Sequence, residues 1–448
     1  MLLAAVILLF VLLVGAAILH IFLGWPLLLG VGIFGLYAKR QGKTLGDIGT
    51  MLLEGLKKAW IVIQVLIVIG LLTASWIACG TIPYLMRLGT LLIRPHVFVL
   101  CCFWICAAMS FLLGTSFGTA NTVGIVLITI ARAGGVSIPM TAGAILCGIY
   151  FGDRASPMSS SLLLLSTLSE TRLYDNVKMG VTSAVLPFAL ASGGYLICSA
   201  ANPLSDAFSE MAGLLAEAFD LNPLVLLPTV VVLLLCVVRK PVKWAMAVST
   251  LLACILAVTL QGMEPLTLGK VLVLGFSLPE SSPLSGIVHG GGLVSMGKSC
   301  AIVTSSCAIA GIVEGMQLTE LLTRGNRSGN RLTIYLKTLV TGVVTAAIGC
   351  NQTIAIVLTH TIRKPDYHSL GKQTLARDLS FAGILAPVLV PWCIAGYTPL
   401  EQLGATGLAW MPYAFWLWLM LAWQGVCCWR GWGSPKKAVT PLEGAKTP

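Results

Sequence analysis

Tyr150-Phe-Gly-Asp-Arg-Ala-Ser-Pro-Met-Ser-Ser-Ser161 is an island of polar and helix-breaking residues between two strongly apolar segments. In lipid, a broken backbone is tolerated only where protein or a water-filled cavity satisfies the freed polar groups. We therefore interpret the stretch as the middle of a discontinuous transmembrane helix, interrupted at Gly152 and Pro157. The alternative is a polar loop between two spans. Oxygen ligands for an ion or a substrate are offered here by Asp153, Ser156, Ser159, Ser160 and Ser161.

The composition is typical of an all-α polytopic membrane protein. Hydrophobic residues make up 57% of the sequence and charged residues 10%, whereas soluble domains contain about 25% charged residues. Apolar runs of about 20 residues recur along the whole chain. We therefore expect about ten to twelve spans, joined by short loops and without a separate soluble domain.

Basic residues occur in short clusters between the apolar runs. The net charge of +11 could indicate a nucleic-acid partner, but this distribution follows the positive-inside rule instead. We place the loops 39–58 and 239–243 in the cytoplasm. The expected location is the cytoplasmic membrane, crossed several times, with lipid as a partner and no nucleic acid.

The N-terminal region is predicted to contain retained spans rather than a signal peptide, because no basic n-region precedes its apolar run. Residues 46–58 alternate apolar and charged side chains and favour an interfacial amphipathic helix. A span over 59–79 and a second interfacial helix over 84–95 should follow. The expected parts are 1–49 (N-terminal spans and a cytoplasmic loop), 50–200 (first repeat), 201–284 (linking spans), 285–430 (second repeat) and 431–448 (basic tail).

A glycine- and threonine-rich segment, 114–124, separates two apolar arms of about 16 residues, which is short for a full crossing. Such a pattern indicates a re-entrant hairpin whose tip lies at membrane depth. Hydroxyl and amide groups at the tip should face the Asp153 island. These are Thr115, Ser116, Thr119, Asn121 and Thr122.

The second half of the chain repeats the first at a constant offset. Ser75 to Gly80 corresponds to Ser306 to Gly311, and Asn121 to Leu127 corresponds to Gln352 to Leu358, both with a separation of 231 positions. Inverted repeats with discontinuous helices are typical of secondary transporters, whose site lies at the repeat interface. From the second half, Asn351, Gln352 and Thr353 should approach the Asp153 island.

Some motifs imitate enzymes. Gly292 to Ser299 has the spacing of a P-loop, but neither a preceding strand nor a solvated helix is predicted around it. His289 to Gly292 imitates an oxyanion-hole motif without a nucleophile elbow. Cys101, Cys102 and Cys106 lack a nearby histidine or carboxylate that would complete a metal site. We therefore expect no enzyme, no nucleotide and no cofactor, apart from a bound sodium ion.

These residues resemble the NhaC family of sodium/proton antiporters over roughly residues 40–420. The resemblance implies a sodium/proton antiporter. Asp153, as an acid at membrane depth, is the expected sodium ligand. The motifs that carry the resemblance are Thr73 to Pro83, Gly114 to Thr119, Gly148 to Pro157, Leu173-Tyr-Asp175, Pro391-Trp392 and Trp410 to Phe415.

Several acidic residues of the family pattern are absent. Ser160 replaces an aspartate, Asn351 precedes Gln352 where the family has an aspartate, and the Glu-Asp of a later motif is Ser380-Phe381. Asp153 is then the obvious acid in the broken segments, with Arg154 as its counter-charge or as an anion-binding group. Alternatives are exchange of a small organic anion of the malate/lactate type, a passive channel and a nontransporting receptor. We also allow for a homodimer.

Overall fold

The computed structural model describes residues 2–19, 21–205, 207–238, 240–279, 282, 284, 288–316 and 330–432. Within this part of the chain the structure is helical, apart from one antiparallel pair of short strands, β1 (Phe276–Ser277) and β2 (His289–Gly290). The predicted all-α class is confirmed. The predicted basic tail, 431–448, lies outside the described residues from 433 onward, as does the segment 317–329 of the predicted second repeat.

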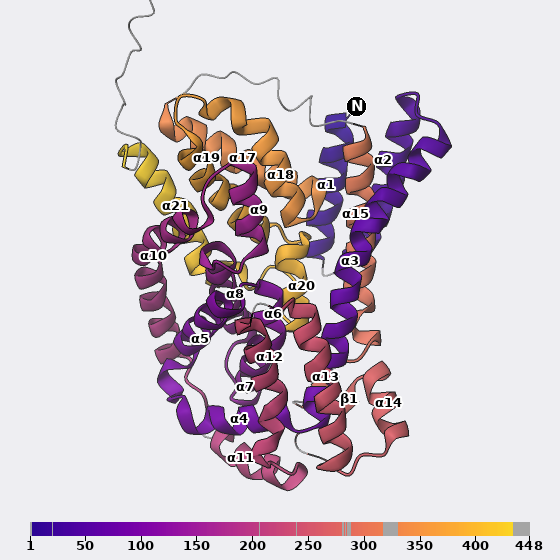
Figure 1. Cartoon of the computed structure of the whole chain (residues 1–448), viewed down its shortest axis with the longest axis vertical. Helices are drawn as coiled ribbons and strands as arrows, with labels where there is room; N and C mark the ends of the chain where they lie inside the picture. The colour runs from indigo at the N-terminus through magenta and orange to yellow at the C-terminus, as the bar shows by residue number, and fades with distance from the viewer. Residues whose placement is uncertain are drawn as a thin grey trace, which may run out of the picture.

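Figure 1 labels most of these helices and colours them along the chain. Their bounds are α1 (Leu2–Ile18), α2 (Gly24–Arg40), α3 (Leu45–Ala78), α4 (Thr81–Leu92), η1 (Pro95–Val97), α5 (Phe98–Leu113), α6 (Ser116–Thr119), the π-helix η2 (Ala120–Gly124), α7 (Ile125–Ala133), α8 (Ile138–Ala155), α9 (Ser160–Leu168), α10 (Leu173–Ala201), α11 (Ala207–Ala218), η3 (Pro223–Leu226), α12 (Leu227–Val237), α13 (Val242–Thr259), α14 (Pro265–Leu274), η4 (Val294–Met296), α15 (Gly297–Gly315), α17 (Arg331–Gly349), α18 (Gln352–Arg363), η5 (Lys364–Tyr367), α19 (Lys372–Leu379), the π-helix η6 (Ser380–Leu385), η7 (Ala386–Leu389), α20 (Ile394–Gln402), η8 (Met411–Tyr413) and α21 (Phe415–Trp429).

The described residues contain 6 helices that are long and apolar enough to cross a membrane, or up to 7 if a bent helix pair is one span. Five shorter apolar helices accompany them. The expected number of about ten to twelve spans is reached only when these shorter helices are included. The protein is thus a multi-pass membrane protein.

One predicted boundary is wrong, because the interfacial helix 46–58 and the span 59–79 form a single helix, α3, of 34 residues. A capping box starts it, in which the Thr44 side chain accepts from the Asp47 backbone and the Asp47 carboxylate accepts from Thr44. The glycines of this segment do not interrupt the helix. The alternation of apolar and charged residues correctly indicated that the first part of α3 is exposed. It did not mean that the helix ends before the apolar span.

Helices α3 and α15 approach each other closely through glycines. A Cβ atom added to Gly55 would lie 2.1 Å from the Cys307 carbonyl oxygen, and one added to Gly311 would lie 2.3 Å from that of Met51. Small residues allow such backbone contact between membrane helices. This helix pair therefore depends on glycine at both positions.

The variant Gly311→Ala is expected to lose stability, because α3 and α15 must separate to admit the methyl group. Overpacking of this kind costs about 1–3 kcal/mol. Thermal melting of the purified protein in detergent, followed by tryptophan fluorescence, measures the loss. The matched control on the same helix is Gly297→Ala, where no atom lies within 4 Å of the added Cβ. Equal melting temperatures for the two variants would contradict the packing account.

Both halves contain a hairpin that is broken by the same sequence of backbone conformations. Gly114 and Cys350 are left-handed, with φ of 67° and 49°, and the next residues are extended, Thr115 at φ −147°, ψ 127° and Asn351 at φ −143°, ψ 133°. Each extended residue then caps a new helix with its side chain. The predicted tip 114–124 is therefore mostly helical, and the break is confined to residues 114 and 115.

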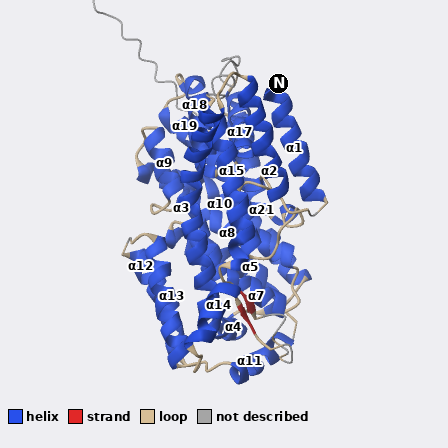
Figure 2. Ribbon diagram, turned by 90° about the vertical axis from the view of Figure 1, so that its right-hand side faces the viewer, coloured by secondary structure: helices blue, strands red, loops and turns tan. Residues whose placement is uncertain are grey.

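A second break occurs in each half at a corresponding place. It separates α8 from α9 at residues 156–159, and η7 from α20 at residues 390–393. In each half the hairpin tip contacts this break, since a Cβ on Gly114 would lie 2.3 Å from Met158 and the Ile394 N–H donates to the Cys350 carbonyl. Both views show α17, α18 and α19 at one end of the molecule and α4 and α7 at the other (Figures 1 and 2). This placement is the one expected for inverted repeats, although the symmetry axis itself stays a prediction.

Candidate functional site

Asp153 lies in the last turn of α8 and is 3% exposed. Gly152, predicted to interrupt the helix, is instead part of α8, and the break begins only at Ser156. A Cβ on Gly152 would lie 2.1 Å from the carbonyl carbon of Ser110 in α5. This glycine therefore serves close helix packing, and the packing holds the end of α8, with Asp153, in the interior.

Neutral groups from both halves surround the Asp153 carboxylate. The Ser159 hydroxyl donates to Oδ1 over 3.0 Å, and the Ser161 hydroxyl donates to Oδ2 over 3.2 Å. From the second hairpin, Gln352 Nε2 donates to Oδ2 over 3.0 Å and also to the Ile384 carbonyl over 3.2 Å. The carboxylate therefore lies where the two halves meet.

No ion pair within the described residues includes Asp153. Burying a carboxylate with only neutral partners costs free energy, and such groups are normally neutralised by a proton or by a bound cation. The serine hydroxyls and the Gln352 carbonyl can supply the neutral oxygen ligands that a hard cation prefers. The site is thus suited to a proton or a small cation.

The predicted pairing of Arg154 with Asp153 is not found. Arg154 is 1% exposed and points to other elements. Its guanidinium donates to Ser380 Oγ over 3.2 Å, to the Gly180 carbonyl over 3.0 Å and to Ser183 Oγ over 3.0 Å. The guanidinium carbon also lies 4.3 Å from the centre of the Phe381 ring. These contacts involve all three guanidinium nitrogens, and through them Arg154 joins α8, α10 and η6.

The other predicted serines of the island differ in burial. Ser156 is buried and donates to the Phe111 carbonyl over 2.6 Å, which fixes the break against α5. Ser160 is exposed, whereas its neighbour Ser161 reaches Asp153. Because α9 begins at Ser160, its helical phase decides which serine faces inward.

The first hairpin places its polar side chains mainly on its own backbone. Thr119 donates to the Thr115 carbonyl and Thr122 to the Gly118 carbonyl, each over 2.8 Å, while Ser116 is buried at 3% exposure. Asn121 is 2% exposed, and its Oδ1 has no hydrogen-bond partner among the described residues. None of the hydrogen bonds within the described residues joins these five side chains to the Asp153 carboxylate, whereas Ser116 interacts with Tyr150, the first residue of the island.

In the second hairpin only Gln352 reaches Asp153. Asn351 caps α18, with its Oδ1 accepting from the Thr353 N–H over 2.8 Å. Asn351 and Thr353 line a cavity of about 640 Å³ together with Lys58 and Glu314, which form an ion pair. The predicted trio therefore lies between the Asp153 site and this cavity.

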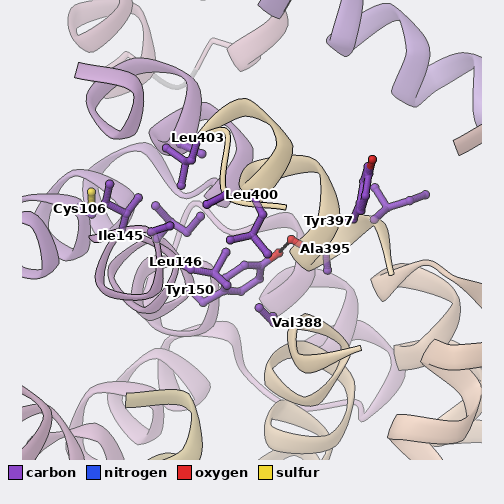
Figure 3. Close-up of a cluster of buried hydrophobic side chains, with 14 of the residues drawn as sticks. Cys106, Ile145, Leu146, Tyr150, Val388, Ala395, Tyr397, Leu400 and Leu403 are labelled. Atoms are coloured by element: carbon purple, nitrogen blue, oxygen red, sulfur yellow. Dashed lines mark hydrogen bonds between the residues drawn. The ribbon is translucent and has the colours of Figure 1, made fainter. Parts of the chain in front are cut away.

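Tyr150, one turn before Asp153, anchors α8 to the second half. Its hydroxyl donates to the Ala395 carbonyl of α20 over 2.6 Å (Figure 3). Apolar side chains from both helices, including Ile145, Leu146 and Leu400, surround this bond (Figure 3). The helix that carries Asp153 is thus packed directly on the broken helix of the second half.

Residues 148–427, more than half of the chain, match the Na+/H+ antiporter family model. The chain belongs to this family. The NhaC antiporter of Alkalihalophilus pseudofirmus is 29% identical over 406 residues, which are 88% of this chain and 86% of the relative. The resemblance to the NhaC family is thereby confirmed.

Relatives of similar identity have different substrates in their names. The malate-2H+/Na+-lactate antiporter of Bacillus subtilis is 28% identical over 413 residues, covering 90% of this chain and 86% of the relative. The arginine/ornithine antiporter ArcD of Halobacterium salinarum is also 28% identical, over 424 residues that cover 90% and 85%. Family membership therefore leaves the substrate to be argued from the site.

The antiporter chain also contains a buried acid that the sequence analysis missed. Asp378, in α19 directly before the π-helix η6, is 0% exposed. It accepts from both terminal nitrogens of Arg331, over 2.5 and 2.7 Å, from Tyr367 over 2.6 Å and from Gln424 over 2.8 Å. These donors satisfy the carboxylate, which indicates a structural role. Gln424, a single amide within an apolar final helix, was the signal in the sequence that could have revealed it.

Proposed function

We propose that this family member exchanges sodium ions for protons across the cytoplasmic membrane, with both ions binding in turn to Asp153. The single observation that carries the proposal is the buried Asp153 carboxylate, which has only neutral partners and lies where the two halves meet. A bound sodium ion or a proton would neutralise the same charge. The two ions therefore compete for the site, and no enzymatic chemistry is required.

The hydrogen-bond donors around Asp153 come from both halves of the protein, and this arrangement is suited to alternating access. Ser159 and Ser161 belong to the break of the first half, and Gln352 belongs to the hairpin of the second half. Relative motion of the halves would change the access to the ion while the carboxylate keeps its place in α8. A channel has no need of two broken elements that meet at one carboxylate.

Proteoliposomes that contain a pH-sensitive dye test the proposal directly. A sodium gradient imposed across the membrane is expected to drive a proton flux of opposite direction, with little response to potassium. Malate, lactate, arginine and ornithine gradients belong in the same screen. Flux driven by an organic ion but not by sodium would overturn the assignment of sodium as the substrate.

One observation favours a second candidate, the exchange of a small organic ion. The cavity of about 640 Å³ that Asn351 and Thr353 line has the size of a small-molecule site, and the Lys58–Glu314 pair lines it as well. A zwitterion or a carboxylate could be bound there. Arg154 does not line this cavity, and its guanidinium contacts Ser380, Gly180 and Ser183 instead.

The serines at the break provide a matched pair of variants. Ser159→Ala removes a hydroxyl that contacts Asp153, and Ser160→Ala removes one that is exposed. The Ser159 oxygen is proposed to become a ligand of the bound sodium ion. An interaction with a charged group contributes about 1.5–3 kcal/mol, so its loss in Ser159→Ala should weaken apparent sodium affinity about tenfold or more. Ser160→Ala should leave it unchanged. Sodium titration of transport rates measures both, and equal affinities in the two variants would count against the assigned ligands.

A further inference from the structure

Two cavities in the described part of the chain share the side chain of Glu401, near the end of α20. The Lys298 cavity, of about 370 Å³, is lined by the α1–α2 connection, the start of α15 and residues 404–407. The Arg132 cavity, of about 210 Å³, is lined by α3, α4, α7 and the loop 288–296. Because Glu401 lines both cavities, it forms part of the partition between them.

The backbone beside Glu401 completes this partition. Gly404 lines both cavities and is left-handed, with φ of 65°. A Cβ at this position would lie 2.0 Å from Arg132 Nη2, which donates to the Leu403 carbonyl over 2.8 Å. Arg132 therefore borders the partition from the side of α7, and the left-handed backbone favours glycine at position 404.

Neutral donors hold the Glu401 carboxyl group. The buried Ser299 hydroxyl of α15 donates to Oε2, and the Tyr397 hydroxyl lies 3.4 Å from Oε1. Figure 3 shows Tyr397 on the opposite side of α20 from Leu400 and Leu403, and Glu401 follows Tyr397 by one helical turn. The carboxyl group thus projects away from the apolar cluster around Tyr150.

Other titratable and charged groups face the partition from each neighbouring element. Lys298 and Cys300 come from α15, Arg132 comes from α7, and His289 comes from the strand β2. The ion pairs within the described residues do not include Glu401. Lys298 acts on the Glu401 carboxylate electrostatically but forms no ion pair with it, so a proton can still neutralise this half-buried acid.

From this geometry we propose that Glu401 is a second proton-binding site, which exchanges protons with water in both cavities and does not bind sodium. A hydronium ion in one cavity protonates the carboxylate and becomes water, and the acid later gives this proton to a water molecule in the other cavity, which becomes hydronium. Only O–H bonds form and break. The inference rests on the proposed sodium/proton exchange and deepens it, because it gives the proton an entry site apart from Asp153.

Infrared difference spectroscopy of the purified protein during acid titration tests the proton site without any transport. The wild type should show a carbonyl band of a protonated carboxylic acid that is absent in Glu401→Gln. The band should persist in Asp153→Asn and in the matched control Glu314→Gln, which removes a glutamate of α15 that is paired with Lys58. An unchanged carboxylic-acid spectrum in Glu401→Gln would overturn the proposal.

Transport provides the second readout. In proteoliposomes, Glu401→Gln should retain exchange of radioactive for unlabelled sodium, while its sodium-driven proton flux should fall by roughly an order of magnitude or more. If a folded Glu401→Gln protein lost sodium/sodium exchange as well as sodium-driven proton flux, the proposal that Glu401 binds protons but not sodium would be overturned. If the amide variant does not fold, Glu401→Asp, which keeps a carboxyl group, replaces it: its carbonyl band should shift in frequency, and an unshifted band would overturn the proposal. The two proposals can fail separately. Absence of sodium flux in the wild type would refute the proposed sodium/proton exchange, and the infrared band would still show whether Glu401 binds a proton.

Discussion

Replacing Asp153 by asparagine is expected to reduce sodium-driven proton flux to the level of protein-free liposomes. The amide keeps the shape of the side chain but can neither take up a proton nor offer a negative charge to a cation. Because the carboxylate is 3% exposed and has only neutral partners, the neutral variant should fold at least as well as the wild type. Flux in proteoliposomes and thermal melting in detergent measure the two effects separately.

The control for this variant is Asp175→Asn, which removes an exposed carboxylate at the start of α10. Its flux should equal that of the wild type. Coupled flux of wild-type size in folded Asp153→Asn would show that another group carries the coupling, and Asp153 would then have to be abandoned as the ion site.

A large loss of stability is expected for Arg331→Met. The substitution removes the bidentate partner of Asp378, whose carboxylate is 0% exposed and would remain bonded only to Tyr367 and Gln424. Breaking a buried ion pair by removing one partner costs about 3–5 kcal/mol. Thermal melting of purified protein in detergent should show a clear fall in the melting temperature.

An exposed ion pair supplies the matched control. Lys372 pairs with Glu170 at the surface, with side-chain exposures of 64% and 56%. Exposed pairs contribute about 0–1 kcal/mol, so Lys372→Gln should melt near the wild type. Adding Asp378→Asn to Arg331→Met should recover part of the lost stability, because the second change removes the unpaired charge. No recovery would indicate that packing of the Arg331 side chain, rather than its charge, is the main contribution.

Much of the architecture could be predicted from local sequence. Composition and span length give the membrane class, and the polar islands at 114–124 and 150–161 predict the hairpin and the first broken helix. The matching breaks of the second half follow from the repeat. The alignment of the repeats was less accurate. By backbone conformation Thr115 is equivalent to Asn351, whereas the constant sequence offset made Asn121 equivalent to Gln352.

The details of the site depend on helix phase and on distant packing, which one sequence does not contain. Ser160 and Ser161 differ by one position, yet of the two Ser161 contacts Asp153, because α9 begins at Ser160 and its helical phase turns Ser161 inward. The partners of Arg154 include Ser380, which is 226 positions away. Gly152 was interpreted as a helix breaker because its close contact with α5 cannot be read from neighbouring residues.

The most direct test of the central claim is the dissociation constant of radioactive sodium, measured on the purified wild-type protein as a function of pH. If sodium and a proton compete for the Asp153 carboxylate, the constant should rise about tenfold for each unit of pH below the range in which the site is deprotonated. Asp153→Asn should bind no sodium at any pH. A sodium affinity that does not change with pH would contradict the account.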